Sequence, residues 1–371
     1  MKKWEMMPQI FTGEDCLSRL EQFENERICL VCDPFLIGSE NLQRVLVHLE
    51  QKNEVTAYSE IVPDPPIEVV AEGVARMKVH QPTVVVTVGG GSAIDTAKAM
   101  LFTMLVTGYD KVKRFIAIPT TSGTGSEVTS ASVVTDTKEK IKYPVFDKRL
   151  IPDEALLDPE LVISSPPKVT AYSGLDVLTH ALEALVAKNR TTYTDALSEK
   201  AIRYVLTYLE ECYRNGENLH ARKKMHEASC LAGLAFDAAG LGINHALAHQ
   251  VGGQFKVPHG LANAMLLPHV VSFNAKNAEA SRTYAKIAVQ MGLGNASLNE
   301  NLLVAKLVKA IISLCKKVDC PMSLSEFGIE RKTAMDRSKI IAENALKDST
   351  YPFNPIAANE SELISVYTKI V

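Results

Sequence analysis

The chain of 371 residues, with 46% hydrophobic and 22% charged residues, has the composition of an ordinary soluble globular protein and is long enough for two domains. Its formal net charge of -3 gives no electrostatic reason to expect nucleic acid or an anionic membrane as a partner. The apolar runs are too short to cross a bilayer, and the N-terminal MKKWEMMPQI lacks the apolar core of a secretory signal. We therefore expect a cytoplasmic protein.

The cysteines support a reducing compartment. There are seven, an odd number spread along the chain, which does not predict a disulfide framework. Cys29 and Cys32 form a CxxC pair, a spacing that can mark a redox or zinc site. Because they lie in the apolar run RICLVC, and no second CxxC exists, we interpret them as core residues of a buried strand.

The first half of the chain alternates short apolar runs with helical patterns. Strands are predicted at residues 28–32, 55–58, 83–88 and 115–118, and helices at 41–51 and from near Ile67. The run at 83–88 is continuously apolar, which is typical of a parallel strand that is buried on both faces. This alternation predicts an α/β domain with a mainly parallel, Rossmann-like sheet, which we place at residues 1–168.

A glycine-rich turn follows the strand at 83–88. The sequence GGGSAIDTAK places Gly89, Gly90 and Gly91 before Ser92 and a helical pattern. Glycine lets a ligand approach the backbone closely, and the N–H groups at a helix N-terminus attract anions. The turn is therefore a candidate phosphate cradle. A tight strand-to-helix turn can also need glycine without any ligand, and the GxGxxG fingerprint is absent.

A second loop of small residues, PTTSGTGSEVT, leaves the strand at 115–118. Such loops are commonly just solvated, but two of them at the carboxyl edge of one sheet mark the place where open α/β sheets bind nucleotides. Asp33 ends the strand at 28–32, where its carboxylate can accept hydrogen bonds from an adenosine ribose and would repel a 2'-phosphate. This placement favours NAD over NADP. The alternative is that Asp33 only starts the Asp-Pro turn.

The character of the chain changes after a proline-rich passage at residues 142–170, which is predicted to be a connector. Helical periodicity then dominates and predicts an all-α domain at residues 169–371. This domain carries Asp176 and His180 four residues apart, followed by His245, His249 and His259. Spacing of four places two side chains on one helical face, and imidazole and carboxylate are good ligands for a borderline divalent metal. We predict a metal site of one aspartate and three histidines, with a fourth histidine beside it.

The remaining histidines are interpreted as structural or surface residues. No motif surrounds His48, His80, His220 or His226, and His269 ends a helical segment. No cysteine belongs to the proposed ligand set. This composition argues against a tetrathiolate structural zinc and favours a catalytic metal with an open position.

Four segments can be compared with a known family: GGGSAIDTAK, PTTSGTGSEVT, SGLDVLTHALEA and GLGINHALAHQVGGQFKVPHGLANAMLLPHV. Together they resemble the iron-dependent (group III) alcohol dehydrogenases over essentially the whole chain, and most closely the propanol dehydrogenases of propanediol-utilising bacterial microcompartments. The resemblance implies an enzyme that interconverts short-chain primary alcohols and aldehydes, such as 1-propanol and propanal, with NAD(H). It also implies a homodimer or a larger homo-oligomer and, as in the microcompartment relatives, packaging with microcompartment proteins.

The resemblance also assigns roles to individual residues. The metal ligands would be Asp176, His180, His245 and His259, with Fe(II) as the family metal, although these ligands would also hold Zn(II). His249 would be a proton carrier beside the metal and would form the catalytic group with Asp176 and His245. Phe236 and Phe255 would wall the substrate pocket. The nucleotide site would be lined, in addition to Asp33, by Gly90, Gly91, Ser92, Asp95, Thr120, Thr121, Thr124, Thr129 and Lys142.

Three expectations complete the comparison. The metal would act as a Lewis acid on the substrate oxygen, in a cleft between the two domains. Near the C-terminus, relatives often carry Asn-Pro-Arg where this chain has Asn354-Pro355-Ile356, a departure that affects a local contact. The competing interpretations are a polyol or lactaldehyde oxidoreductase, as in the glycerol dehydrogenases that share this architecture with dehydroquinate synthases, and an inactive cargo or scaffold subunit of a microcompartment.

Overall fold

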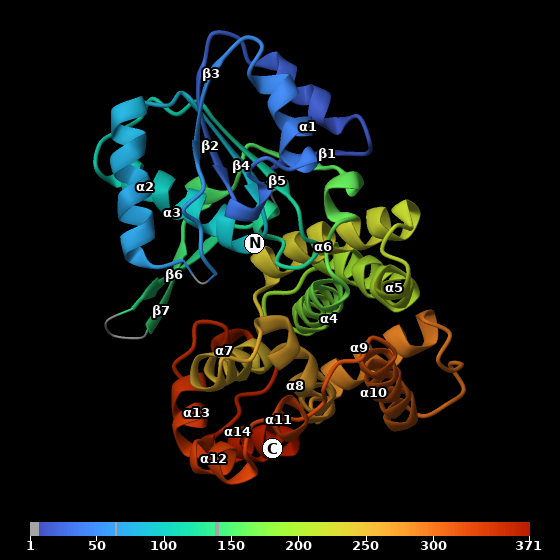
Figure 1. Cartoon of the computed structure of the whole chain (residues 1–371). Helices are drawn as coiled ribbons and strands as arrows, with labels where there is room; N and C mark the ends of the chain where they lie inside the picture. Colours follow the sequence, from blue (N-terminus) through green and yellow to red (C-terminus); the bar gives the residue numbers. More distant parts are fainter. Residues whose placement is uncertain (1–6, 64, 138–140) are drawn as a thin grey trace. The chain divides into compact units, whose positions relative to one another are not determined.

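The structure is a computed structural model and describes residues 7–63, 65–137 and 141–371, without the side chains of Asp136, Ile141 and Lys142. The chain divides into two compact units, one up to Ser165 (unit 1) and one from Pro166 to Val371 (unit 2). Unit 1 is an α/β unit and unit 2 is helical (Figure 1), which confirms the predicted fold class.

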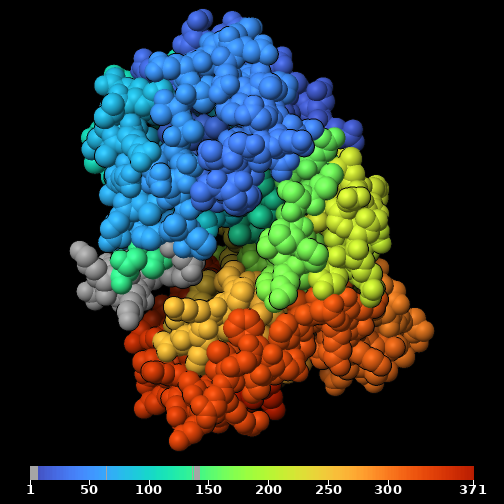
Figure 2. All heavy atoms as spheres, viewed as in Figure 1, coloured from blue at the N-terminus to red at the C-terminus, as the bar shows by residue number. Residues whose placement is uncertain are grey.

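Unit 1 is built on a parallel sheet of six strands in the order β1-β8-β5-β4-β2-β3. The central strand β4 (Val84–Gly89) is buried at every position, as its continuous apolar run predicts. Figure 2 shows that blue atoms from the first helices and strands form most of the visible face of this unit. The other strands of the sheet are β1 (Gln9–Thr12), β2 (Arg27–Cys32), β3 (Glu54–Tyr58), β5 (Arg114–Pro119) and β8 (Glu154–Leu157).

Helices cover both faces of this sheet. Alternate residues of β2 belong to two different apolar clusters, because successive side chains of a strand point to opposite faces. Ile28 and Leu30 pack with α1 (Glu40–Leu49) on one face. Val31 packs on the other face with α2 (Ile67–His80) and α3 (Gly91–Val106). The sheet is therefore the central layer of three.

The CxxC pair lies in this sheet, as predicted. Cys29 belongs to the apolar cluster on one face and Cys32 to the cluster on the other. Both thiols are free and buried, and burial raises the pKa of Cys29 to about 12 and that of Cys32 to about 11. The pair is therefore neither a redox couple nor a metal site.

The predicted connector is wrong in part. Residues 142–170 include most of β7 (Ile141–Phe146), which pairs in an antiparallel hairpin with β6 (Ala131–Asp136), and all of β8. Strand β8 is buried at all four positions and lies between β1 and β5. Its sequence EALL is short and has no β-branched residue. The sequence therefore does not predict a strand there, and the nearby prolines indicate a connector instead.

Unit 2 is made of helices, and no strand occurs in residues 166–371. Its core helix α4 is buried over almost its entire second half. Among the described residues, no single helix is long and apolar enough to cross a membrane; α6 and α7 pass that test only when counted together across a bend of 108°. The larger helices are α4 (Pro167–Ala184), α5 (Thr192–Arg214), α6 (Leu219–Ala239), α7 (Ile243–Phe255), α8 (His259–Asn274), α9 (Ala278–Gln290) and α10 (Glu300–Lys317). Four short helices complete the unit: α11 (Leu324–Phe327), α12 (Arg331–Asp336), α13 (Ser338–Ala345) and α14 (Glu360–Tyr367).

Gly260 allows α8 to begin directly against α4. A Cβ atom at Gly260 would lie 2.1 Å from the main-chain oxygen of Tyr172 in α4. We expect Gly260→Ala to lower the free energy of unfolding by about 1–3 kcal/mol, because one of the two helices must move. Gly253→Ala in α7 is the matched control, since a Cβ atom there meets nothing within 4 Å. Thermal or denaturant unfolding measures both, and equal stability of the two variants would contradict this packing.

Candidate metal centre and nucleotide loops

Four of the predicted site residues meet inside unit 2. Asp176 and His180 lie on successive turns of α4, His245 lies in the first turn of α7, and His259 is the first residue of α8. One potential ligand atom from each of the four lies within 4.8 Å of all the others. Asp176, His180 and His245 are buried, whereas the side chain of His259 is 40% exposed.

The local sequence explains why the histidines of α7 and α8 come together. Helix α7 ends at Phe255, and Lys256 adopts a left-handed conformation with φ of 55°. Only Val257 and Pro258 separate that residue from His259. A turn this short brings the beginning of α8 back to α7, so residues fourteen apart in sequence contribute to one cluster.

The ligand atoms converge on one point. Asn263, one turn into α8, donates its side-chain N–H to Oδ1 of Asp176 at 2.7 Å. The same Nδ2 atom lies 3.1 Å from Nε2 of His245 and 3.1 Å from Nε2 of His259. These three atoms therefore surround one N–H donor, and together with an atom of His180 they form the group whose members lie within 4.8 Å of one another. Three imidazoles and a carboxylate are a suitable donor set for Fe(II) or Zn(II), and these residues fit such a metal.

Electrostatics keep His245 in the form that binds metals. Burial lowers the pKa of His245 well below its ordinary value, and the neighbouring His180, His259 and His249 lower it further. A neutral imidazole has the free lone pair that a metal ligand needs. On the opposite side of this ring, burial raises the pKa of Glu183 to about 8, even though hydrogen bonds from the main-chain N–H groups of Asn244 and His245 oppose this rise.

His249 lies beside the cluster and outside the group of converging ligand atoms. Its ring stacks on His259, with centroids 5.3 Å apart and planes at 15°. Its Nδ1 lies 2.8 Å from Oδ2 of Asp348, a residue that sequence reasoning missed. Burial alone would raise the pKa of Asp348, but hydrogen bonds from His249 and Thr350 lower it. No motif marks Asp348, because the contact joins residues 99 positions apart.

The two predicted pocket phenylalanines lie in different surroundings. Phe236 in α6 contacts the ring of His180, with centroids 4.5 Å apart. Phe255 is half-buried at the end of α7 and packs against the main apolar core of unit 2. The C-terminal Asn354 is buried and accepts the N–H of Ile243 at 3.2 Å, and it donates to the carbonyl of Ile356 at 2.9 Å. The segment that departs from the family pattern thus holds the start of α7.

The two predicted nucleotide loops lie next to each other in unit 1. Gly90 precedes α3, and its N–H donates to Oδ2 of Asp33 at 2.8 Å. One oxygen of Asp33 therefore holds the glycine turn in place. Burial raises the pKa of the Asp33 carboxyl, although this hydrogen bond opposes the rise. A Cβ atom at Gly91 would lie 2.6 Å from the side chain of Thr124 in the second loop. Any larger residue at Gly91 would push the loops apart.

Some predicted nucleotide-site residues have partners within the protein. Asp95 accepts hydrogen bonds from the Ser126 hydroxyl at 2.9 Å and from the Val133 N–H at 3.1 Å. The buried Lys98 donates to the carbonyl of Thr129 at 2.6 Å. These contacts fix the Ser/Thr loop on α3. Thr120 is buried, while Ser92, Thr121 and Thr124 are half-buried, and the side chain of Lys142 lies outside the described residues.

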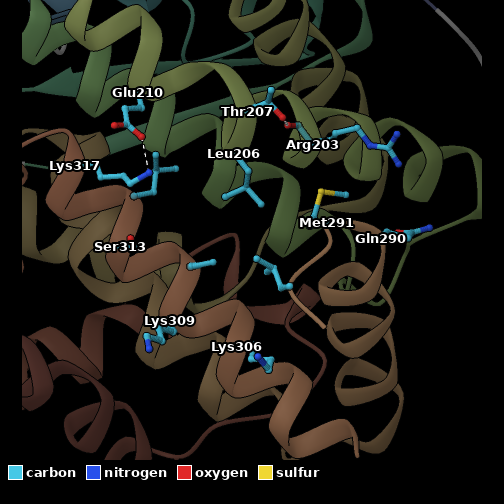
Figure 3. Close-up of a pocket in the computed structure, with 13 residues that line it drawn as sticks. Arg203, Leu206, Thr207, Glu210, Gln290, Met291, Lys306, Lys309, Ser313 and Lys317 are labelled. Atoms are coloured by element: carbon cyan, nitrogen blue, oxygen red, sulfur yellow. Dashed lines mark hydrogen bonds and ion pairs between the residues drawn. The ribbon is translucent and has the colours of Figure 1, made fainter. Parts of the chain in front are cut away.

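A pocket of about 630 Å³ elsewhere in unit 2 contains none of the predicted site residues (Figure 3). It lies between α5, α10 and the end of α9. Arg203 projects from α5 and Lys306 and Lys309 project from α10, while Glu210 pairs with Lys317 at 2.6 Å. The converging ligands are therefore the stronger candidate for the reaction centre.

Known proteins of one family are similar to this chain over both of its units. The model of the iron-containing alcohol dehydrogenases matches residues 8–159, and that of the C-terminal part of the Fe-containing alcohol dehydrogenase family matches residues 170–371. The chain is 44% identical to a 1-propanol dehydrogenase, PduQ, of Salmonella typhimurium, over 97% of each chain. It is 37% identical to an NADPH-dependent butanol dehydrogenase of Clostridium saccharobutylicum, over 99% of this chain and 97% of that one. A crystal structure of a 1,3-propanediol oxidoreductase, 32% identical, superposes with a TM-score of 0.92 over 100% of both chains.

We expect Asp176→Ala to abolish most of the stabilisation that Fe(II) or Zn(II) gives to the protein. A ligand at one hundred times its dissociation constant stabilises a protein by about 2.7 kcal/mol. The variant loses the carboxylate around which the histidines are arranged, so its melting temperature should hardly respond to metal. Thermal unfolding under anaerobic conditions, with and without metal, measures this difference. His220→Ala, at an exposed position of α6, should respond like the wild type, and an equal response of Asp176→Ala would contradict the ligand assignment.

Proposed function

Because the chain belongs to the iron-containing alcohol dehydrogenase family, we propose that it interconverts short-chain primary alcohols and aldehydes with NAD(H), with 1-propanol and propanal as its preferred pair. The observation that carries the proposal is the convergence of Asp176, His180, His245 and His259 within 4.8 Å. The 1-propanol dehydrogenase relatives, 43% and 44% identical over nearly the whole chain, support the choice of substrate.

Each group of residues has a distinct task in this proposal. Fe(II), or Zn(II), held by the four ligands would polarise the substrate oxygen as a Lewis acid, and NAD(H) would accept or supply the hydride. The glycine turn that begins at Gly89 presents main-chain N–H groups at the N-terminus of α3, where they can bind phosphate oxygens. Phe236 walls the cluster on the side of His180 and excludes water from that side.

His249 is the proposed proton carrier. Its Nδ1 is occupied by Asp348 at 2.8 Å, so its other ring nitrogen remains for exchange of a proton with the substrate or with solvent. The side chain is 33% exposed, which gives the proton a route to water. Asp348 is itself held by the N–H and hydroxyl of Thr350, at 2.9 and 2.7 Å, and this fixes the ring of His249 beside the cluster.

We propose NAD as the preferred dinucleotide. One oxygen of Asp33 accepts the Gly90 N–H, so the carboxylate is held at the end of β2 next to the glycine turn. A negative charge fixed there would accept hydrogen bonds from ribose hydroxyls and repel a 2'-phosphate. A homodimer or larger assembly in the cytoplasm, packaged in a bacterial microcompartment, belongs to the same proposal and is supported by the resemblance to microcompartment propanol dehydrogenases.

A diol is the second candidate substrate, because relatives include a 1,3-propanediol oxidoreductase of known structure and a 1,3-propanediol dehydrogenase of Klebsiella pneumoniae that is 34% identical over 98% of this chain. The proposed metal ligands would contact the metal in the same way with a three-carbon alcohol as with a three-carbon diol, so their positions do not discriminate between these substrates. The polar groups that line the pocket decide between them.

We expect the purified protein, loaded anaerobically with Fe(II), to oxidise NADH when propanal is added. Chelation of the metal should reduce the rate at least 100-fold, and restored Fe(II) or Zn(II) should recover it, because the polarising charge is lost and regained. NADPH should be the poorer reductant. Absorbance of NADH measures the rate, and parallel assays with lactaldehyde, 1,3-propanediol and glycerol compare the alternatives. If the metal-loaded protein turned over none of the short aldehydes, the proposed enzymatic activity would be rejected.

We expect His249→Ala to lower kcat by about 100-fold with unchanged metal content, since loss of one positioned proton carrier typically costs 10²–10⁴ in rate. Asp348→Asn should have a smaller effect, because one amide oxygen can still accept from His249, although the charge is removed and the NH₂ group cannot accept from Thr350. Steady-state kinetics across pH and metal analysis measure both variants. Unaltered turnover and pH profile in His249→Ala would show that protons leave by another route.

A further inference from the structure

Glu183 is a buried carboxylate that has no assigned role in the reaction. It lies on α4, three residues after His180 and seven after Asp176, so the three side chains form one stripe along the helix. Glu183 is 3% exposed, and the ring of His245 is its ion-pair partner. Burial of a carboxylate is costly unless other groups compensate it, so its surroundings indicate what it does.

Both carboxylate oxygens of Glu183 receive hydrogen bonds from the start of α7. Oε1 accepts the N–H of Asn244 at 2.7 Å, and Oε2 accepts the N–H of His245 at 3.4 Å. These N–H groups belong to the first turn of α7, where the helix dipole favours a negative charge. The approach also requires Gly242, because a Cβ atom there would lie 2.8 Å from Oε1 of Glu183.

The same carboxylate contacts the ring of His245 on the side away from the cluster. Nδ1 of His245 lies 2.5 Å from Oε2 of Glu183. The amide nitrogen of Asn263, a donor, lies 3.1 Å from Nε2 on the other side of the ring, so Nε2 is the acceptor and the proton of the neutral ring lies on Nδ1, toward Glu183. Nε2 therefore carries the lone pair that a metal needs, and it lies 3.8 Å from Oδ1 of Asp176 inside the cluster.

We propose that Glu183 is a positioning residue that fixes the tautomer and the orientation of His245 and thereby strengthens metal binding. A carboxylate bonded to the far nitrogen of a metal-binding histidine orients the ring and makes the ligand more basic. His245 is 2% exposed, so water cannot replace this contact. Glu183 holds the main chain and the side chain of the same residue, which locks Nε2 toward the metal. This inference rests on the metal centre of the proposed function.

The test is the affinity of the full chain for Co(II), measured by visible absorption during titration with a competing chelator. Glu183→Gln keeps the size of the side chain but replaces one acceptor oxygen with an NH₂ group, so the dissociation constant should rise about 10-fold. Glu183→Ala removes the contact, and the dissociation constant should rise up to about 100-fold. Asp195→Asn is the control, because Asp195 is a half-buried carboxylate of unit 2 that pairs with Arg190 at 2.6 Å. Its Co(II) affinity should equal that of the wild type.

Two further readings separate positioning from simple stabilisation. Unfolding of the metal-free variants shows how much stability each change costs, and Glu183→Gln keeps the experiment informative if Glu183→Ala does not fold. Long-range ¹H–¹⁵N spectra of histidine-labelled, metal-free protein should show the Nδ1–H form of His245 in the wild type and a gain of the Nε2–H form in Glu183→Gln. A lower melting temperature with unchanged Co(II) affinity and tautomer would overturn the proposal.

The outcomes also distinguish this inference from the proposed function. If the wild type binds Co(II) and both variants bind it equally well, the role of Glu183 is wrong while the metal centre stands. If the wild type binds no Co(II), the metal centre and the role of Glu183 are both rejected. If the variants bind weakly as expected but the wild type turns over no aldehyde, the inference stands and the proposed activity fails.

Discussion

The packing of unit 2 is constrained by helix α4, which is buried around most of its circumference but carries a stripe of polar side chains. In the second half of α4, the buried apolar residues Leu175, Leu178 and Leu182 alternate with Asp176, His180 and Glu183. Leaving such groups unpaired in the core would cost several kcal/mol. The packing of α6, α7 and α8 around α4 must therefore do more than bury apolar area: it must bring an aromatic ring, helix N–H groups and further ligands to defined positions.

Each unit stabilises a carboxylate in the same way, half-buried Asp33 in unit 1 and buried Glu183 in unit 2. In unit 1, Asp33 at the end of β2 accepts the N–H of Gly90 at the start of α3. In unit 2, Glu183 accepts N–H groups at the start of α7. Each carboxylate meets the positive end of a helix dipole, and in each case a glycine at the turn allows the close approach. A Cβ atom at Gly89 would lie 2.5 Å from Asp33, as the one at Gly242 would crowd Glu183. These charges and the glycine backbone thus fix the turn before α3 and the start of α7 within the protein itself.

The sequence predicted what depends on local spacing and missed what depends on distant partners. Spacing of four placed Asp176 and His180 on one helical face, and a continuous apolar run identified β4. Strand β8 could not be found this way, because four residues without β-branching become a strand only between β1 and β5. Glu183 lay within a motif but resembled any helical glutamate until α7 was placed against it. Asp348 reaches His249 from 99 residues away, and no periodicity records such a contact.

The distribution of exposure around the cluster defines the side on which chemistry can occur. Asp176, His180 and His245 are each no more than 4% exposed, and Phe236 covers the ring of His180. The side chains of His259 and His249 are 40% and 33% exposed and stack on each other. Within unit 2 the cluster is therefore most exposed at these two rings. The proposed ligand His259 and the proposed proton carrier His249 lie together on this side, so in the proposed reaction the substrate oxygen and its proton would be handled from the same direction.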